Sequence, residues 1–232
     1  MEAAQVPRQR VEQLLDAAVR YTEERRWDVC PGTWLEPSGG GRRCSCGEEA
    51  CAAPGAHPAR DDWADGATGS GAAARRMWSR QPGAAVLLPT GRAFDAVDVP
   101  ESAGFLALAR MERMSLPLGP VTRTPDRRMQ FFVHPGAAAK AADLVRRAGW
   151  NAASIGLRGV GEGGYVIAPP TRVGGVGAVQ WARSPTTANR WLPEVEELIG
   201  PLAYACGRAA ADARQASRAG RDLPHTAQER LS

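Results

Sequence analysis

The sequence predicts an α+β protein in which helices pack on a mainly antiparallel sheet. Two observations indicate this class. Five segments carry apolar residues at helical spacing, and short apolar runs bounded by Gly or Pro, which are typical of strands, lie between them. Two of these runs flank a turn signal, Pro125-Asp126, and predict a hairpin. Hydrophobic residues make up 44% of the chain, which is enough for a core, and the sequence has no internal repeat.

Five helices follow from the periodicity. In the first, residues 8–26, one side is apolar and consists of Val11, Leu14, Leu15, Ala18 and Tyr21. The other four helices are expected at residues 72–80, 101–114, 137–149 and 193–217. Gly149 ends the helix at 137–149.

The strands are predicted from shorter apolar runs. The segment 86–101, VLLPTGRAFDAVDVPE, indicates two strands around a Pro-Thr-Gly turn, and Asp98 ends the second of them. The remaining strands are expected at residues 27–30, 120–124, 129–133, 154–157, 165–168 and 178–182.

We expect one domain over residues 8–217, followed by a polar tail at 218–232. Within the domain, residues 36–70 are rich in Gly, Pro and Cys and have little periodicity, so they predict an irregular insert that needs its own staple or is disordered. No apolar stretch approaches the roughly 20 residues of a membrane span, and the N-terminus lacks the apolar region of a signal peptide. A cytoplasmic protein without a membrane partner is therefore the default expectation.

The positive charge of the chain comes almost wholly from arginine. The net charge is +4, and the 29 basic residues include a single lysine, Lys140. Guanidinium groups suit planar, bidentate contacts with phosphate. Codon composition in a GC-rich genome accounts for part of this bias, so charge alone is weak evidence for a nucleic-acid partner.

The insert contains Cys44, Cys46, Cys51 and His57 in the pattern C-x-C-x4-C-x5-H. In a cytosolic chain, clustered thiols bind metal more often than they form disulfides, and three thiolates with one imidazole complete a tetrahedral zinc site. Such a site is structural because four protein ligands leave no open position. A flexible loop with incidental cysteines is the alternative. Cys30 and Cys206 lie in apolar surroundings and are expected to be packing residues.

Asp98 has two competing interpretations. A carboxylate at the end of a strand is well placed to hold a divalent metal, because the sheet fixes its direction. However, Asp98-Val99-Pro100-Glu101 also resembles a capping box before a helix, and residue types alone favour capping.

Three arginines are candidates for phosphate contacts. Arg158 begins a glycine-rich turn, RGVGEGGY, whose backbone amides could approach a phosphate, although a long hairpin loop explains the glycines equally well. Arg127 and Arg128 stand at the start of a strand and are either phosphate ligands or solvated turn residues.

Over residues 10–208 the whole pattern resembles the bifunctional DNA primase/polymerase (prim-pol) domain of the archaeo-eukaryotic primase superfamily. CSCGEEACAAPGAHP is similar to the cysteine-bearing C-x-C…C…PGKHP stretch of that family, and AFDAVDVPE falls where the family has an apolar strand ending in D-x-D. GEGGYVIAPPTRVGGVGAVQWAR resembles its G-G-Y-V-V-A-P-P-S…G…Y-x-W signature, which is the most specific piece.

The resemblance implies a primase-polymerase-like fold with an RRM-like sheet. It also implies synthesis of nucleic acid from nucleoside triphosphates with two Mg²⁺ or Mn²⁺ ions. This sequence departs from the family pattern at the positions of the catalytic residues. The first acid of the D-x-D maps to Asp98 but the second maps to Pro100, the strand histidine falls near Met129, and the third acid maps to Gly156.

Three functions remain open at this level. In the first, the protein binds nucleotide or nucleic acid through Arg127, Arg128 and Arg158, and its catalysis is reduced or lost. In the second, it is an active polymerase in which Glu101 joins Asp98 at the metal. In the third, the fold is a non-catalytic scaffold for interaction or regulation. A replication role would need a separate helicase or replication protein as partner.

Overall fold

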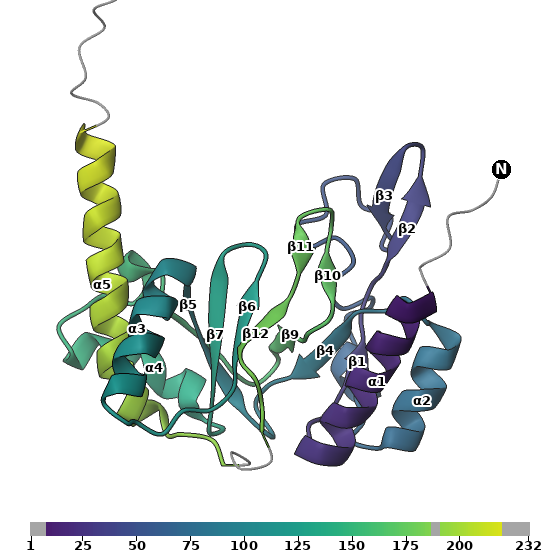
Figure 1. Cartoon of the computed structure of the whole chain (residues 1–232), viewed down its shortest axis with the longest axis horizontal. Helices are drawn as coiled ribbons and strands as arrows, with labels where there is room; N and C mark the ends of the chain where they lie inside the picture. The colour runs from purple at the N-terminus through teal and green to yellow at the C-terminus, as the bar shows by residue number, and fades with distance from the viewer. Residues whose placement is uncertain (1–7, 187–190, 220–232) are drawn as a thin grey trace, which may run out of the picture.

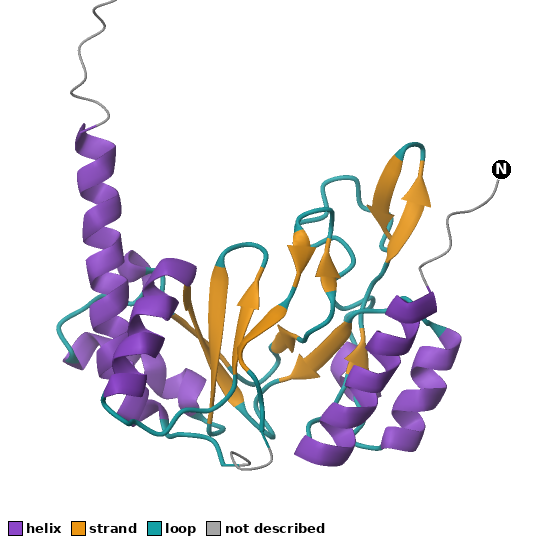
Figure 2. Ribbon diagram, viewed as in Figure 1, coloured by secondary structure: helices purple, strands orange, loops and turns teal. Residues whose placement is uncertain are grey.

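The computed structural model describes residues 8–186 and 191–219. In Figures 1 and 2 helices pack against a small sheet in the N-terminal part of the chain and against a larger sheet in the C-terminal part. The five predicted helices are confirmed, with ends within two residues of expectation. They are α1 (Arg8–Arg25), α2 (Gly71–Arg80), α3 (Glu101–Arg113), α4 (Ala137–Arg147) and α5 (Val195–Ala219).

The larger sheet has five strands in the order β12-β6-β7-β5-β8, and every neighbouring pair is antiparallel. The predicted hairpin around Pro125 is present as β6 and β7. The antiparallel sheet expected from the sequence is therefore confirmed. Its strands are β5 (Asp95–Pro100), β6 (Val121–Thr124), β7 (Arg128–Val133), β8 (Arg158–Val160) and β12 (Gln180–Arg183).

A three-stranded sheet in the order β1-β4-β9 supports the N-terminal part. Two separate hairpins, β2–β3 and β10–β11, project from the body on the same side as the β6–β7 turn (Figure 1). The strands outside the five-stranded sheet are β1 (Cys30–Pro31), β2 (Leu35–Ser38), β3 (Gly41–Cys44), β4 (Val86–Pro89), β9 (Tyr165–Ile167), β10 (Arg172–Val173) and β11 (Gly177–Ala178).

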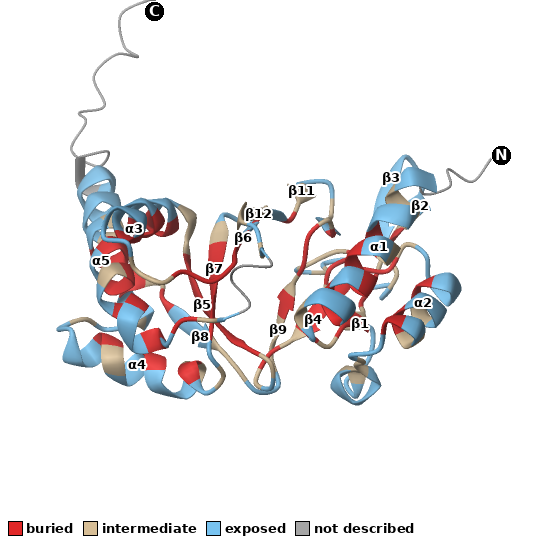
Figure 3. Ribbon diagram, turned by 60° about the horizontal axis from the view of Figure 1, so that its bottom comes forward, coloured by how far each residue is buried: buried red, intermediate tan, exposed pale blue. Residues whose placement is uncertain are grey.

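Side chains alternate across the five-stranded sheet and give it two different faces. On one face, alternate residues of β5 and β7, among them Val97 and Phe131, pack against α3, α4 and α5. On the other face, Phe132 stacks on Phe94 with ring centroids 4.5 Å apart and contacts Trp27 of the N-terminal part. In Figure 3 buried residues, in red, lie along β5 and on the sides of the helices that face the sheet.

The two strands predicted in the segment 86–101 are present as β4 and β5, but β4 belongs to the three-stranded sheet and β5 to the five-stranded sheet. Other strand predictions were wrong in detail. The glycine-rich turn after Arg158 likewise connects the two sheets, since β8 and β9 lie in different ones. The strand expected at 154–157 is a short 3-10 turn, Ala153–Ile155, and the chain becomes extended only at Arg158.

The insert and the tail also differ from expectation. The insert at residues 36–70 is less irregular than predicted, because the β2–β3 hairpin gives its first part regular pairing. The helix-capping interpretation of Asp98 was wrong, since the N-cap of α3 is Pro100 and Asp98 lies within β5. The tail expected at 218–232 lies, from residue 220 onward, outside the described residues.

Candidate functional site

The face of the five-stranded sheet that carries Phe132 changes from apolar to polar along its strands. Ala96 and Phe132 lie at the apolar end, and two residues further on Asp98 of β5 faces Gln130 of β7 in register. Because side chains two residues apart share a face, this pair belongs to the same surface as the stacked aromatic rings. The hydrophobic contacts of the apolar end therefore fix the direction of the polar side chains.

Asp98 is the centre of this polar end, and its side chain is only 1% exposed. Arg128 donates to Asp98 Oδ1 from Nε at 2.6 Å and also from Nη2. Arg158, opposite Asp98 on β8, donates to the same oxygen from Nε at 3.1 Å. Gln130 Nε2 donates to the second oxygen, Oδ2, at 3.2 Å. Both carboxylate oxygens are thus engaged by side chains of neighbouring strands.

The groups around this carboxylate are themselves held in place. Arg128 Nη2 donates to the carbonyl oxygen of Gly156 at 2.7 Å, and its side chain is 20% exposed. Thr122 of β6 donates to Gln130 Oε1 at 3.2 Å, which directs the amide nitrogen of Gln130 toward Asp98. Arg128 and Gln130 are therefore held by these other contacts in positions from which they donate to Asp98.

The two positions to which the resemblance maps the second and third acids, Pro100 and Gly156, lie beside this cluster. A Cβ added to Gly156 would lie 3.2 Å from Cγ of Pro100 and 3.7 Å from Nη1 of Arg128. Pro100 and Gly156 therefore lie next to each other, and neither has a carboxylate. Arg128 contributes a cation to that same place.

This donor set does not fit a pair of divalent metal ions. Two-metal sites need converging carboxylates, and Mg²⁺ is held by one or two carboxylates with open oxygen lone pairs. Among the described residues, Asp98 is the single acid of this cluster, and two arginines and a glutamine donate hydrogen bonds to its oxygens.

Glu101, the other predicted catalytic acid, lies among different arginines. It begins α3, and its carboxylate accepts hydrogen bonds from Arg123 Nε and forms an ion pair with Arg127 Nε at 3.5 Å. Hydrogen bonds from Arg123, together with the charge of Arg127, lower the pKa of Glu101. We call the pocket lined by these residues the β6–β7 pocket. Its volume is about 280 Å³, and its remaining walls come from Thr124, Pro125, Val176, Gly177, Ala178 and Gln180.

The structure therefore divides the predicted site residues into two groups. Arg128 and Arg158 join Asp98, whereas Arg127 joins Glu101 in the β6–β7 pocket. Sequence reasoning missed Gln130 and Arg123. The hairpin register could have found Gln130, because it places that residue two positions from Arg128 on the same face.

The third group of predicted ligands is the cysteine cluster. The donor atoms of Cys44, Cys46, Cys51 and His57 all lie within 4.8 Å of one another. Cys44 Sγ is 3.3 Å from His57 Nε2, and His57 Nδ1 is 2.7 Å from the carbonyl oxygen of Pro58. A proton on Nδ1 donated to that carbonyl leaves the lone pair of Nε2 directed at the thiols, as a metal-binding histidine requires. The set could hold a metal ion such as zinc, which would stabilise the insert.

Hydrogen bonds also lower the pKa of one thiol of this cluster. Burial by itself would raise the pKa of the Cys44 thiol, but hydrogen bonds from the backbone N–H groups of Cys46 and Gly55 outweigh burial and lower the pKa to about 6. Thiolate is the metal-binding form of cysteine, so Cys44 is the natural first ligand.

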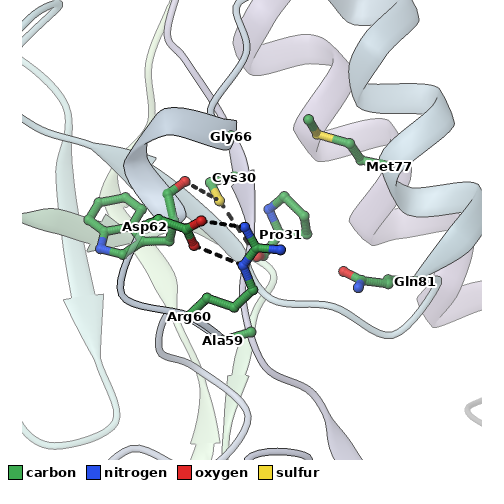
Figure 4. Close-up of a pocket in the computed structure, with 9 residues that line it drawn as sticks. Cys30, Pro31, Ala59, Arg60, Asp62, Gly66, Met77 and Gln81 are labelled. Atoms are coloured by element: carbon green, nitrogen blue, oxygen red, sulfur yellow. Dashed lines mark hydrogen bonds and ion pairs between the residues drawn. The ribbon is translucent and has the colours of Figure 1, made fainter.

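Cys30 lies in a separate cavity of about 230 Å³, shown in Figure 4. Its thiol donates to the carbonyl oxygen of Trp63 at 3.3 Å, and burial raises its pKa to about 11. The same cavity contains Arg60, whose guanidinium is held by Asp62 (Figure 4). A protonated, buried thiol agrees with the packing role predicted for Cys30. Cys206 is also buried, among residues of the sheet and α5, and burial raises its pKa to about 12.

Comparison with protein families identifies the class. The family model described as bifunctional DNA primase/polymerase, N-terminal, matches residues 18–195, which is most of the chain. The protein belongs to this prim-pol family, and the resemblance stated from its motifs is confirmed. No curated protein and no solved structure matches the chain. Among the described residues, no helix is long and apolar enough to cross a membrane.

Proposed function

We propose that this prim-pol family protein binds nucleotide or nucleic acid and has reduced or lost nucleotidyl transfer. Nucleotidyl transfer by this family implies acids that hold divalent ions on the triphosphate, and catalysis of this kind consists largely of positioning and charge stabilisation. Loss of the acids removes the metal ions, but a basic surface can still bind phosphate groups.

The observation that carries this proposal is that two arginine side chains already bind the carboxylate of Asp98. Arg128 and Arg158 neutralise the carboxylate, and the adjacent Pro100 and Gly156 offer no second acid. A metal ion at Asp98 would have to displace a guanidinium that also binds the Gly156 carbonyl. Arg158 keeps 65% of its side chain exposed, so it is the residue of this cluster best able to contact a phosphate.

Zinc is the metal that we assign to the cysteine cluster, and its role is structural. Three sulfur ligands and one imidazole are the donor set that zinc prefers in structural sites. All four ligands come from the protein, so a bound ion has no open position for a substrate. Zinc would supply folding energy to a segment with little core of its own.

Template–primer extension with Mn²⁺ tests the loss of catalysis. We expect the wild-type protein to add no nucleotides above the level of the Asp98→Ala variant. Mn²⁺-dependent incorporation that Asp98→Ala abolishes would contradict the proposal and favour an active enzyme.

Binding of a fluorescent nucleoside triphosphate tests the retained function in the same preparation. Binding should not require added Mg²⁺ or Mn²⁺, and Arg158→Gln should weaken it several-fold, because binding depends on guanidinium–phosphate contacts. Arg146→Gln is the matched control, since Arg146 is also exposed but pairs with Asp143 on α4. If neither nucleotide nor oligonucleotide binds at low salt, the protein is a non-catalytic scaffold.

A further inference from the structure

Residues 58–67, which follow the cysteine cluster, form a wall of two cavities. The first is the cavity of about 230 Å³ that contains Cys30, and the second, of about 520 Å³, reaches His57 and Tyr165. The residues that line both cavities are Ala59, Arg60 and Trp63. A segment that borders two cavities has few atoms to pack against, so it gains little from dispersion contacts. We call residues 58–67 the strap.

The strap has few other contacts with the rest of the protein. Its short 3-10 turn, η1 (Trp63–Gly66), contains no buried residue. The ring of Trp63 packs edge-on against Tyr165 with centroids 5.4 Å apart, and the Cys30 thiol donates to the Trp63 carbonyl oxygen at 3.3 Å. Among the described residues, this is the one hydrogen bond that joins the strap to the rest of the chain away from its two ends. Segments with so few contacts open at a low free energy.

Figure 4 shows the strap at the cavity around Cys30. Arg60 and Asp62 of the strap lie on one side of this cavity, and Met77 and Gln81 of α2 line the other side. Arg60 and Asp62 form an ion pair with each other, at 2.5 Å, on the exposed surface. This ion pair is internal to the strap, so it does not tie the strap to α2 and would persist if the strap moved away.

The two ends of the strap are held in different ways. After its last residue, Thr68 forms an antiparallel bridge with Val29, with hydrogen bonds of 2.9 and 3.0 Å. Before its first residue, His57 N–H donates to Thr33 Oγ1 at 3.2 Å, and the His57 carbonyl oxygen accepts from Thr33 N–H at 2.8 Å. His57 also belongs to the cysteine cluster, and a structural zinc ion contributes far more free energy than two such hydrogen bonds. The metal would therefore provide most of the stability at this end.

We propose that zinc at the cysteine cluster holds the strap closed over the cavity around Cys30, and that the strap opens when the metal is lost. The inference rests on the zinc assigned above, and it does not depend on nucleotide or nucleic-acid binding. It couples occupancy of the metal site to solvent access in a neighbouring cavity. The thiol of Cys30 lies in that cavity and is not a member of the cysteine cluster, so it reports on opening.

The test is the rate at which N-ethylmaleimide labels Cys30 in the full chain, because a thiol reacts only when the reagent can reach it. Peptide mass spectrometry reads each cysteine separately. We expect Cys30 to react about tenfold faster, or more, once a chelator has removed zinc, because the opened strap no longer covers it. Cys206 is the internal control. It is buried in the core beside α5 and should react at the same slow rate with and without zinc.

Zinc content is measured on the same samples, so that each result has one meaning. Equal acceleration of Cys30 and Cys206 would show that metal loss unfolds the whole domain, and it would overturn the strap. Labelling of Cys30 that does not change when zinc is removed would overturn it as well. A wild-type protein that binds no zinc would overturn both the metal assignment and the strap, but it would leave the proposed nucleotide binding intact.

Trp63→Ala should open the strap without removing a metal ligand. It deletes the ring contact with Tyr165, so Cys30 should react several-fold faster while zinc is still bound. Trp191→Ala is the matched control, since this tryptophan is 56% exposed and lies outside the strap; it should leave the labelling rate unchanged. If Trp63→Ala left the rate at the level of the control, the strap would not be what protects Cys30, and the proposal would be wrong.

Discussion

Asp98 shows how the neighbours of one residue decide its chemistry. Its carboxylate is buried and paired with arginines that lie 30 and 60 positions away in the sequence. The sequence predicts an acid on a strand at this position, and this prediction is correct. Its partners could not be predicted from local pattern, because they depend on the register of three strands that no short motif specifies.

Asp98→Asn should lower the free energy of unfolding by about 3 kcal/mol, because it leaves Arg128 partly buried beside a neutral group. Denaturation in urea measures this change. Asp143→Asn on the exposed surface of α4 is the control and should change stability by less than about 0.5 kcal/mol. An Asp98→Asn protein as stable as the wild type would mean that the carboxylate is not a structural ion-pair partner.

Among the secondary-structure elements, helices were predicted better than strand pairings. Helix periodicity and end signals are local, so all five helices were found. The partners of β4 and β5 were not, because a Pro-Thr-Gly turn predicts a change of direction but not whether the next strand joins the same sheet. The D-x-x-E pattern before α3 misled for a related reason. Pairing of β5 with β7 continues through Pro100, so Asp98 is a strand residue.

Contact between α3 and the sheet depends on Gly104. A Cβ at this position would lie 2.6 Å from Sδ and 2.9 Å from Cβ of Met129, so Gly104→Ala should cost about 1–3 kcal/mol of stability. Gly200→Ala in α5 is the matched control. Apart from its chain neighbours, nothing lies within 4 Å of an added Cβ there. The helix preference of alanine is offset by the ring of Pro201, which follows Gly200 inside α5, so stability should change by less than about 1 kcal/mol. Thermal and chemical denaturation of both variants would show the larger loss for Gly104→Ala; equal effects would contradict this packing.

At the scale of the whole molecule, the cysteine-bearing insert is joined to both parts of the chain around it. Thr33 N–H donates to the carbonyl oxygen of His57 at 2.8 Å, and Gly174 N–H donates to that of Pro54 at 2.8 Å. The Cys/His cluster was predictable because its four residues lie close in sequence. Its attachment to the β10–β11 hairpin, about 120 residues further on, depends on the tertiary fold.

Removal of zinc should therefore destabilise more than the insert. Protein purified without chelator should contain about one equivalent of zinc, and Cys46→Ser should lower both the zinc content and the melting temperature. Cys206→Ala is the control; it should retain zinc because Cys206 lies in the core beside α5. Zinc well below one equivalent in the wild-type protein would exclude the site.

The backbone at Pro100 has a consequence for the history of this chain. Its φ of −56° and ψ of 140° suit proline and also suit an acidic residue. An exchange between the two would leave the path of the chain unaltered where β5 passes into α3. The backbone at this position therefore does not by itself distinguish proline from an acidic residue. One substitution at such a position can remove a catalytic acid while the fold is retained. Membership of the family therefore does not by itself show that a protein has kept the chemistry.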